Sequence, residues 1–194
     1  MNLLYVLESS SLSMVRSREY GETIMELSLD VGCGKLKRGD IGIDLSKNSV
    51  ADVICDAHLL PFRQENFSKV VSITVLEHSP NPLNFLKEQN RVLKYGGTIE
   101  VTTDNAQYFA WSVMNFGRGG DRHQKLAEGH CMIFYPENVE ALLEMAGFKI
   151  QKKELITKKT KLDPIVTLLI KSTLWRKESR FFRFKITAVK EHPA

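Results

Sequence analysis

The sequence predicts an α/β fold in which a mostly parallel β-sheet carries helices on both faces. Three observations lead to this prediction. Segments typical of strands alternate with segments typical of helices, residues 67–74 form a nearly continuous apolar strand, and a glycine turn directly follows the first strand. Because parallel neighbours need right-handed crossovers, the alternation requires helices above and below the sheet.

Four strands are predicted in the first half of the chain. Apolar residues alternate over 25–31 and again over 41–45, and a short apolar piece covers 51–55. Residues 67–74 are rich in β-branched side chains and lack the alternation of a half-exposed strand. This fourth strand is therefore expected near the centre of the sheet.

Two helices are predicted further along. Asn81-Pro82 supplies an N-cap and a proline for the first helical position, and Gly96-Gly97 is expected to end this helix. Residues 98–103 form the next predicted strand. The second helix is predicted to begin at Pro136 and to end at Gly147, because glycine suits the left-handed conformation that closes many helices.

The 194 residues, of which 43% are hydrophobic, suffice for one globular domain. No repeat or low-complexity linker divides them, so residues 1–194 are treated as one domain. It has an N-terminal lead (1–22), a body (23–150) and a basic C-terminal part (151–194). A strand, a helix and a strand are predicted toward the C-terminus, at 149–156, 164–175 and 181–190.

Composition excludes several classes of protein. The net charge of +4 is too small to identify a nucleic-acid or membrane partner. The cysteines Cys33, Cys55 and Cys131 are odd in number and lack C-x-x-C spacing, so neither a disulfide framework nor a structural zinc site is expected, and a reducing cytoplasm is favoured. The apolar run 3–7 is too short for a signal peptide, and no stretch approaches the roughly 18 apolar residues of a membrane span.

Acids and glycines follow the predicted strands at the points where ligands bind in open α/β sheets. The relevant positions are Asp30 to Gly34, Asp44, Asp56-Ala57, and Thr74 to His78. The glycines allow a ligand to approach the backbone closely. Asp44 is expected to accept hydrogen bonds from both hydroxyls of a ribose, which suits a nicotinamide dinucleotide as well as S-adenosylmethionine.

The residues after the glycine turn favour S-adenosylmethionine over NAD. A dinucleotide site needs a third glycine and a long helix that holds the pyrophosphate, but Gly34 is followed by Lys35-Leu36-Lys37-Arg38, which leaves no room for a helix before Ile41. S-adenosylmethionine has no phosphate, and its donors are hydroxyl, amine and ammonium groups. Carboxylates such as those of Asp30, Asp44 and Asp56 accept hydrogen bonds from all of these.

Six motifs follow one another in the body of the chain, at residues 27–34, 41–46, 55–62, 75–82, 91–97 and 134–148. In this order they resemble the class I S-adenosylmethionine-dependent methyltransferases, in particular the type 11 group. The resemblance extends from about residue 25 to residue 147. It implies a Rossmann-like sheet of seven strands whose last strand is antiparallel, and it implies methyl transfer as the activity.

The resemblance also implies roles for individual residues. Asp30 and the turn Gly32-Cys33-Gly34 would lie at the methionine end of the cofactor, with the Cys33 side chain as a space-filler. Asp44 and Leu45 would contact ribose and adenine, Asp56-Ala57 the adenine amino group, and Thr74 the methionine moiety. The loop between the first two motifs is short, which predicts a reduced or absent first crossover helix and a more open cofactor site. Tyr95 replaces the usual proline of the fifth motif, which is expected to alter only a turn.

His78 is the candidate general base. It follows the fourth strand and titrates near neutral pH, so it could remove a proton from the methyl acceptor. In an alternative interpretation, its side chain stabilises the turn before Pro80 through a backbone hydrogen bond. The two interpretations predict different effects on turnover when His78 is replaced.

No metal ion is predicted. Glu77, His78 and His130 are similar to ligands in a metal-assisted subset of the superfamily, but the first acidic ligand of that subset corresponds to Thr74 here. Residues 117–129, together with His123 and His130, are expected to form either a loop over the active site or a solvated surface loop.

The expected acceptor is a small molecule or a glycan. The asparagine-proline motif that is typical of amino-group methylation of nucleobases is absent from residues 74–77. Two alternatives remain open. The basic C-terminal part could serve an RNA methyltransferase, or the chain could be a non-catalytic S-adenosylmethionine-binding partner subunit.

Overall fold

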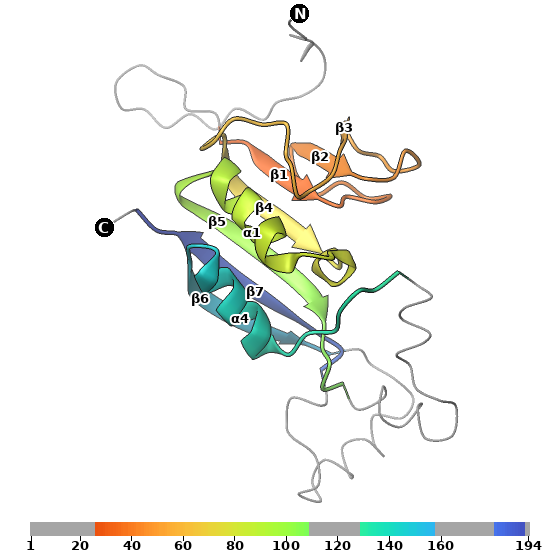
Figure 1. Cartoon of the computed structure of the whole chain (residues 1–194), viewed down its shortest axis with the longest axis vertical. Coiled ribbons are helices and arrows are strands. Elements are labelled where there is room, and N and C mark those ends of the chain that lie inside the picture. Colours follow the sequence, from red (N-terminus) through yellow and green to blue (C-terminus); the bar gives the residue numbers. More distant parts are fainter. Residues whose placement is uncertain (1–25, 109–128, 158–180, 193–194) are drawn as a thin grey trace, which may run out of the picture.

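The computed structural model describes residues 26–108, 129–157 and 181–192, which build one seven-stranded sheet (Figure 1). Its strands are β1 (Ser28–Val31), β2 (Ile41–Asp44), β3 (Val53–Ile54), β4 (Phe67–Ile73), β5 (Leu93–Asp104), β6 (Phe148–Ile156) and β7 (Arg183–Lys190). Only β7 runs antiparallel to its neighbours, whereas the other paired strands are parallel. The predicted fold class, with seven strands and an antiparallel last strand, is confirmed.

The strands lie in the order β3-β2-β1-β4-β5-β7-β6. As predicted, β4 is internal, and its side chains Phe67, Val70, Val71 and Ser72 are buried. The strand order reverses between β1 and β4. In open α/β sheets such a reversal leaves a crevice at the carboxyl ends of the strands, which places the expected ligand site beside β1 and β4.

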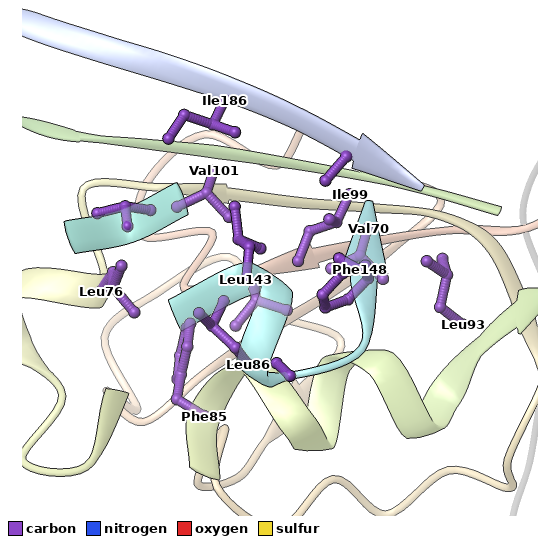
Figure 2. Packing of buried hydrophobic residues seen from close by; sticks show 14 of the residues in the cluster. Val70, Leu76, Phe85, Leu86, Leu93, Ile99, Val101, Leu143, Phe148 and Ile186 are labelled. Carbon is purple, nitrogen blue, oxygen red and sulfur yellow. The ribbon is translucent and has the colours of Figure 1, made fainter. Parts of the chain in front are cut away.

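The two described α-helices, α1 (Pro82–Val92) and α4 (Pro136–Met145), pack against each other on one face of the sheet (Figure 1). Figure 2 shows Phe85, Leu86 and Leu143 of these helices gathered against side chains of the sheet. Each such fully buried side chain contributes roughly 2 kcal/mol of hydrophobic stabilisation. The helix predicted at 164–175 lies outside the described residues. Neither described α-helix is long and apolar enough to cross a membrane.

Both helices begin where the sequence predicts. Oδ1 of Asn81 accepts a hydrogen bond from the N–H of Asn84 at 3.1 Å, and Pro82 is the first helical residue. Pro136 likewise opens α4. Gly147 follows that helix with a φ of +89°, a conformation that glycine adopts without strain.

The predicted end of α1 is wrong. The helix ends at Val92, and β5 begins at Leu93 and not at residue 98. The carbonyls of Arg91 and Val92 accept hydrogen bonds from the N–H groups of Glu65 and Asn66 at 3.0 and 2.8 Å. These tertiary bonds satisfy the last helical carbonyls, so the chain turns into the sheet four residues earlier than the glycines suggest.

The first crossover contains turns and no helix over residues 32–40, as the short loop predicts. The N–H groups of Gly32 and Cys33 both donate to the carbonyl of Ile43, at 2.8 and 3.0 Å. This pair of bonds ties the turn after β1 to the end of β2. At the other end of the chain, β6 and β7 from the basic C-terminal part complete the same sheet.

Candidate functional site

A cavity of about 280 Å³ lies at the carboxyl ends of the first strands. It is lined by Gly32, Ile43, Asp44, Leu45, Cys55, Asp56, Ala57, His58, Thr74, Val75, His78, Ser79 and Phe85. Most of the predicted site residues therefore meet in one place. Three of them, Asp30, Cys33 and Gly34, do not line the cavity.

The Asp44 carboxylate is held at the end of β2 by two backbone amides. Oδ2 accepts from the N–H of Gly34 at 2.8 Å, and Oδ1 accepts from the N–H of Ser46 at 2.7 Å. Each oxygen retains a further lone pair for a ligand hydroxyl. Gly34 thus serves the site by fixing Asp44, and not by lining the cavity.

Asp30 and Cys33 lie beneath the turn. The Asp30 side chain is 1% exposed, and its Oδ2 accepts from the N–H of Arg38 at 2.7 Å. Its Oδ1 has no hydrogen-bond partner among the described residues, and burial raises the pKa of this carboxyl. Cys33 is buried beside Gly42, which fits the predicted role as a space-filler.

His58 is the main residue that sequence reasoning missed. Its ring nitrogens lie 2.6 Å from Oδ1 of Asp56 and 2.7 Å from Oγ of Ser79. The hydrogen bonds from the backbone and side chain of His58 lower the pKa of Asp56. The only signal in the sequence is the two-residue spacing between Asp56 and His58, which permits this bond.

Thr74 directly follows β4 and has a strained backbone conformation. Its φ is +56°, which is a rare value for a β-branched residue and costs of order 1–3 kcal/mol. The surrounding structure holds it there, because its N–H donates to the carbonyl of Thr102 at 2.7 Å. Strain of this kind gathers at functional sites, and Thr74 lies on the cavity wall.

His78 ends a short 3₁₀ helix, η1 (Leu76–His78), which the sequence did not predict. Nδ1 of His78 lies 3.1 Å from the carbonyl oxygen of Gly129. A carbonyl only accepts hydrogen bonds, so Nδ1 carries a proton, and in the neutral ring Nε2 then keeps its lone pair. The ring therefore binds a segment far along the chain and not the turn before Pro80.

Glu77 and two histidines lie close together beside the cavity. Their candidate ligand atoms, from Glu77, His78 and His130, are all within 4.8 Å of one another. Oε2 of Glu77 accepts from the Thr103 hydroxyl at 2.8 Å, and its Oε1 is buried with no hydrogen-bond partner in the part of the chain that the structure describes. Thr74 adds no carboxylate to this group. His123 lies outside the described residues.

Any methyl transfer by this chain is expected to be insensitive to chelators, because the described residues supply three of the four ligands of the metal-assisted pattern. Turnover measured with and without an excess of EDTA should agree within error. A loss of turnover that a single divalent cation restores would show that the prediction of no metal is wrong.

A pH-dependent stability effect is predicted for Glu77. Burial raises its pKa in the folded state, so folding favours the protonated form, and wild-type stability should fall as pH rises from about 4.5 through the raised value. Glu77→Gln removes this titration while keeping an acceptor for Thr103. Urea unfolding across this pH range should therefore show the variant gaining stability relative to wild type as pH rises. A constant difference would contradict the prediction.

Most of the described basic residues from Lys149 onward form ion pairs with acids, whereas Lys190 donates to the carbonyl of Leu93 at 2.8 Å. The pairs are Lys149–Glu191 at 3.1 Å, Lys152–Glu154 at 3.0 Å, Lys153–Glu140 at 2.9 Å, Arg183–Asp104 at 2.8 Å and Lys185–Glu154 at 3.0 Å. Such pairs contribute little stability but neutralise the local charge. The remaining basic residues of the segment, over 158–180, lie outside the described residues.

Residues 29–101 match the family model described as a methyltransferase domain. Over this range, which is less than half of the chain, the sequence is similar to that family. Every residue that lines the cavity falls within the matched range.

Known proteins resemble more of the chain than this domain. An uncharacterised protein of Methanocaldococcus jannaschii, MJ1252, is 30% identical over 113 residues, which are 51% of this chain and 45% of the relative. The match thus spans less than half of that protein's length.

Solved structures share the fold of the methyltransferase domain and its flanking strands. An S-adenosylmethionine-dependent methyltransferase from Archaeoglobus fulgidus is 20% identical with a TM-score of 0.63, covering 85% of this chain and 86% of that one. Phosphoethanolamine N-methyltransferase 2 of Haemonchus contortus, solved in complex with S-adenosyl-L-methionine, is 17% identical with a TM-score of 0.57, covering 86% and 49%. At these identities the likeness shows the fold.

Proposed function

We propose that this chain is an S-adenosylmethionine-dependent methyltransferase whose cofactor binds in the cavity at the carboxyl ends of the first strands. The observation that carries the proposal is the presence of two carboxylates, Asp44 and Asp56, in the wall of that cavity. Carboxylates only accept hydrogen bonds, and the ribose and adenine of this cofactor offer hydroxyl and amine donors. The methyltransferase domain match supports the same cofactor.

The residues of the site fit this cofactor. Asp44, whose oxygens are already oriented by two backbone amides, would hold the ribose hydroxyls. Asp56 would accept the adenine amine, and the exposed side chain of Leu45 would cover the base. The buried, unpartnered Oδ1 of Asp30 lies beneath the turn at the methionine end. When bound, S-adenosylmethionine supplies an activated sulfonium methyl group.

His78 is proposed to remove the proton of the acceptor. Its Nδ1 is engaged with Gly129, so the lone pair of Nε2 remains available to take a proton. The side chain is exposed and lies on the cavity wall. A small molecule or a glycan with a protonated heteroatom would fit this chemistry.

The alternative of an RNA acceptor has less support, because most of the described basic residues beyond 148 are paired with acids. An affinity for RNA that falls steeply as the salt concentration rises, as expected of contacts to phosphates, would favour this alternative. The alternative of a non-catalytic partner subunit predicts tight cofactor binding with no methyl transfer by the isolated chain.

Calorimetric titration with S-adenosylmethionine and with NAD tests the cofactor. We expect S-adenosylmethionine to bind and NAD not to bind, and the reverse result would overturn the proposal.

For the general base, we expect His78→Ala to lower turnover about 100-fold with cofactor affinity unchanged. His192→Ala is a matched control, because that imidazole stacks on Tyr95 at 4.9 Å, away from the cavity. Unchanged turnover in His78→Ala would exclude the base role.

A further inference from the structure

Three polar side chains form a continuous hydrogen-bonded chain along the cavity wall. Oδ1 of Asp56 receives both the N–H of His58, at 2.9 Å, and Nδ1 of the same residue, at 2.6 Å. Nε2 of His58 lies 2.7 Å from Oγ of Ser79, whose side chain is 3% exposed. Ser79 directly follows His78 in the chain, so His58 joins the turn after η1 to the loop after β3.

The geometry fixes the tautomer of His58. An ionised carboxylate has no hydrogen to donate, so Nδ1 carries the proton that bonds to Asp56. In the neutral ring Nε2 is then an acceptor, and the Ser79 hydroxyl donates to it. Phe85 packs edge-on against the imidazole, with ring centroids 5.8 Å apart, which limits its rotation.

This arrangement makes the two oxygens of Asp56 unequal. His58 occupies Oδ1 with two donors, whereas no donor from the described residues reaches Oδ2. The Asp56 side chain is 61% exposed, so without the His58 imidazole only the backbone N–H of residue 58 would hold its orientation among the described residues. With His58 in place, one oxygen of the carboxylate is fixed as the free acceptor at the cavity wall.

We propose that His58 is a positioning residue that orients Asp56 to select a base bearing an exocyclic amine over one bearing a carbonyl at the same position. This inference rests on the proposed function, because it concerns the base of the bound nucleoside. An amine donates to the free oxygen of Asp56, whereas a carbonyl would place a second acceptor against it. His58 acts through Asp56 and does not touch the base.

The test compares the affinities for S-adenosylhomocysteine and its 6-oxo analogue, S-inosylhomocysteine, by calorimetry. Wild type should favour the amine about tenfold, the effect of one hydrogen bond to a charged group. His58→Asn retains an N–H near the position of Nδ1 and should keep most of this preference. His58→Gln places its amide near Nε2 instead, so it should lose the preference, as should His58→Ala. An unchanged preference in His58→Ala would overturn the proposal.

A second measurement needs neither ligand nor variant. Nitrogen-15 NMR of the imidazoles should show that Nδ1 of His58 carries a proton, and a ring with its proton on Nε2 alone would overturn the proposal. If wild type binds neither nucleoside, both the proposed function and this inference fail. If it binds both with normal affinity but without preference, only the inference fails.

The order serine, histidine, aspartate also occurs in hydrolases, so a nucleophilic Ser79 is the competing interpretation. It predicts covalent modification of Ser79 by a fluorophosphonate reagent, detected by mass spectrometry of the intact chain. We expect no modification, because the Ser79 side chain is only 3% exposed. Labelling at Ser79 would overturn the positioning role.

Discussion

Asp44→Asn is expected to weaken binding of S-adenosylhomocysteine about 100-fold, the result of losing two hydrogen bonds to a charged group. The amide keeps one oxygen, but its NH₂ group must face either Gly34 or Ser46, whose N–H groups are themselves donors. The variant therefore loses an acceptor for the ligand and also disturbs the turn that holds it. Calorimetric titration of the purified variant measures the loss.

Asp40→Asn supplies the matched control. Oδ2 of Asp40 accepts from the backbone N–H and the hydroxyl of Ser28, at 2.9 and 2.7 Å, at the opposite ends of β1 and β2. Both variants exchange a carboxylate that binds backbone for an amide, but only Asp44 lines the cavity. We expect the control to retain wild-type affinity. Equal losses in the two variants would mean that Asp44 acts through stability and not through the ligand.

The course of the chain through the sheet could be predicted because it depends on local signals. Alternating apolar residues, the Asn81-Pro82 cap and the glycines after β1 and α4 each act within a few residues of their own position. The boundary between α1 and β5 could not be predicted in this way. It depends on amides of Glu65 and Asn66, which lie far back in the chain and satisfy the last carbonyls of the helix.

The same distinction applies to the candidate site. Residues at or just beyond the end of a strand, such as Asp44, Asp56 and Thr74, meet in the cavity because parallel strands bring their carboxyl ends to one edge. His58 and Ser79 lie further into the loops that follow the strands, and their contact joins two loops 21 residues apart in the sequence. The spacing of apolar residues carries no information about such a contact. Only the folded structure shows that His58 orients the Asp56 carboxylate.

Gly32→Ala is expected to lower the free energy of unfolding by about 3 kcal/mol, combining left-handed backbone strain with overpacking. The φ of Gly32 is +71°, and an added Cβ would lie 2.4 Å from Cγ2 of Val75. Gly34 has a φ of +56°, but nothing lies within 4 Å of its added Cβ, so Gly34→Ala should cost only about 1 kcal/mol. Urea unfolding of the two variants separates strain from steric conflict.

A double-mutant cycle with Val75→Ala tests the steric part directly. Removing both Cγ atoms of Val75 should recover about 1–2 kcal/mol in the Gly32→Ala background, whereas it should destabilise wild type. The same truncation should bring no recovery of stability in the Gly34→Ala variant. Because Val75 also lines the cavity, the clash in Gly32→Ala should push the Val75 side chain toward the ligand and weaken cofactor binding. The double variant should restore that binding. Additive effects of the two substitutions would show that Gly32 is required for its backbone conformation alone.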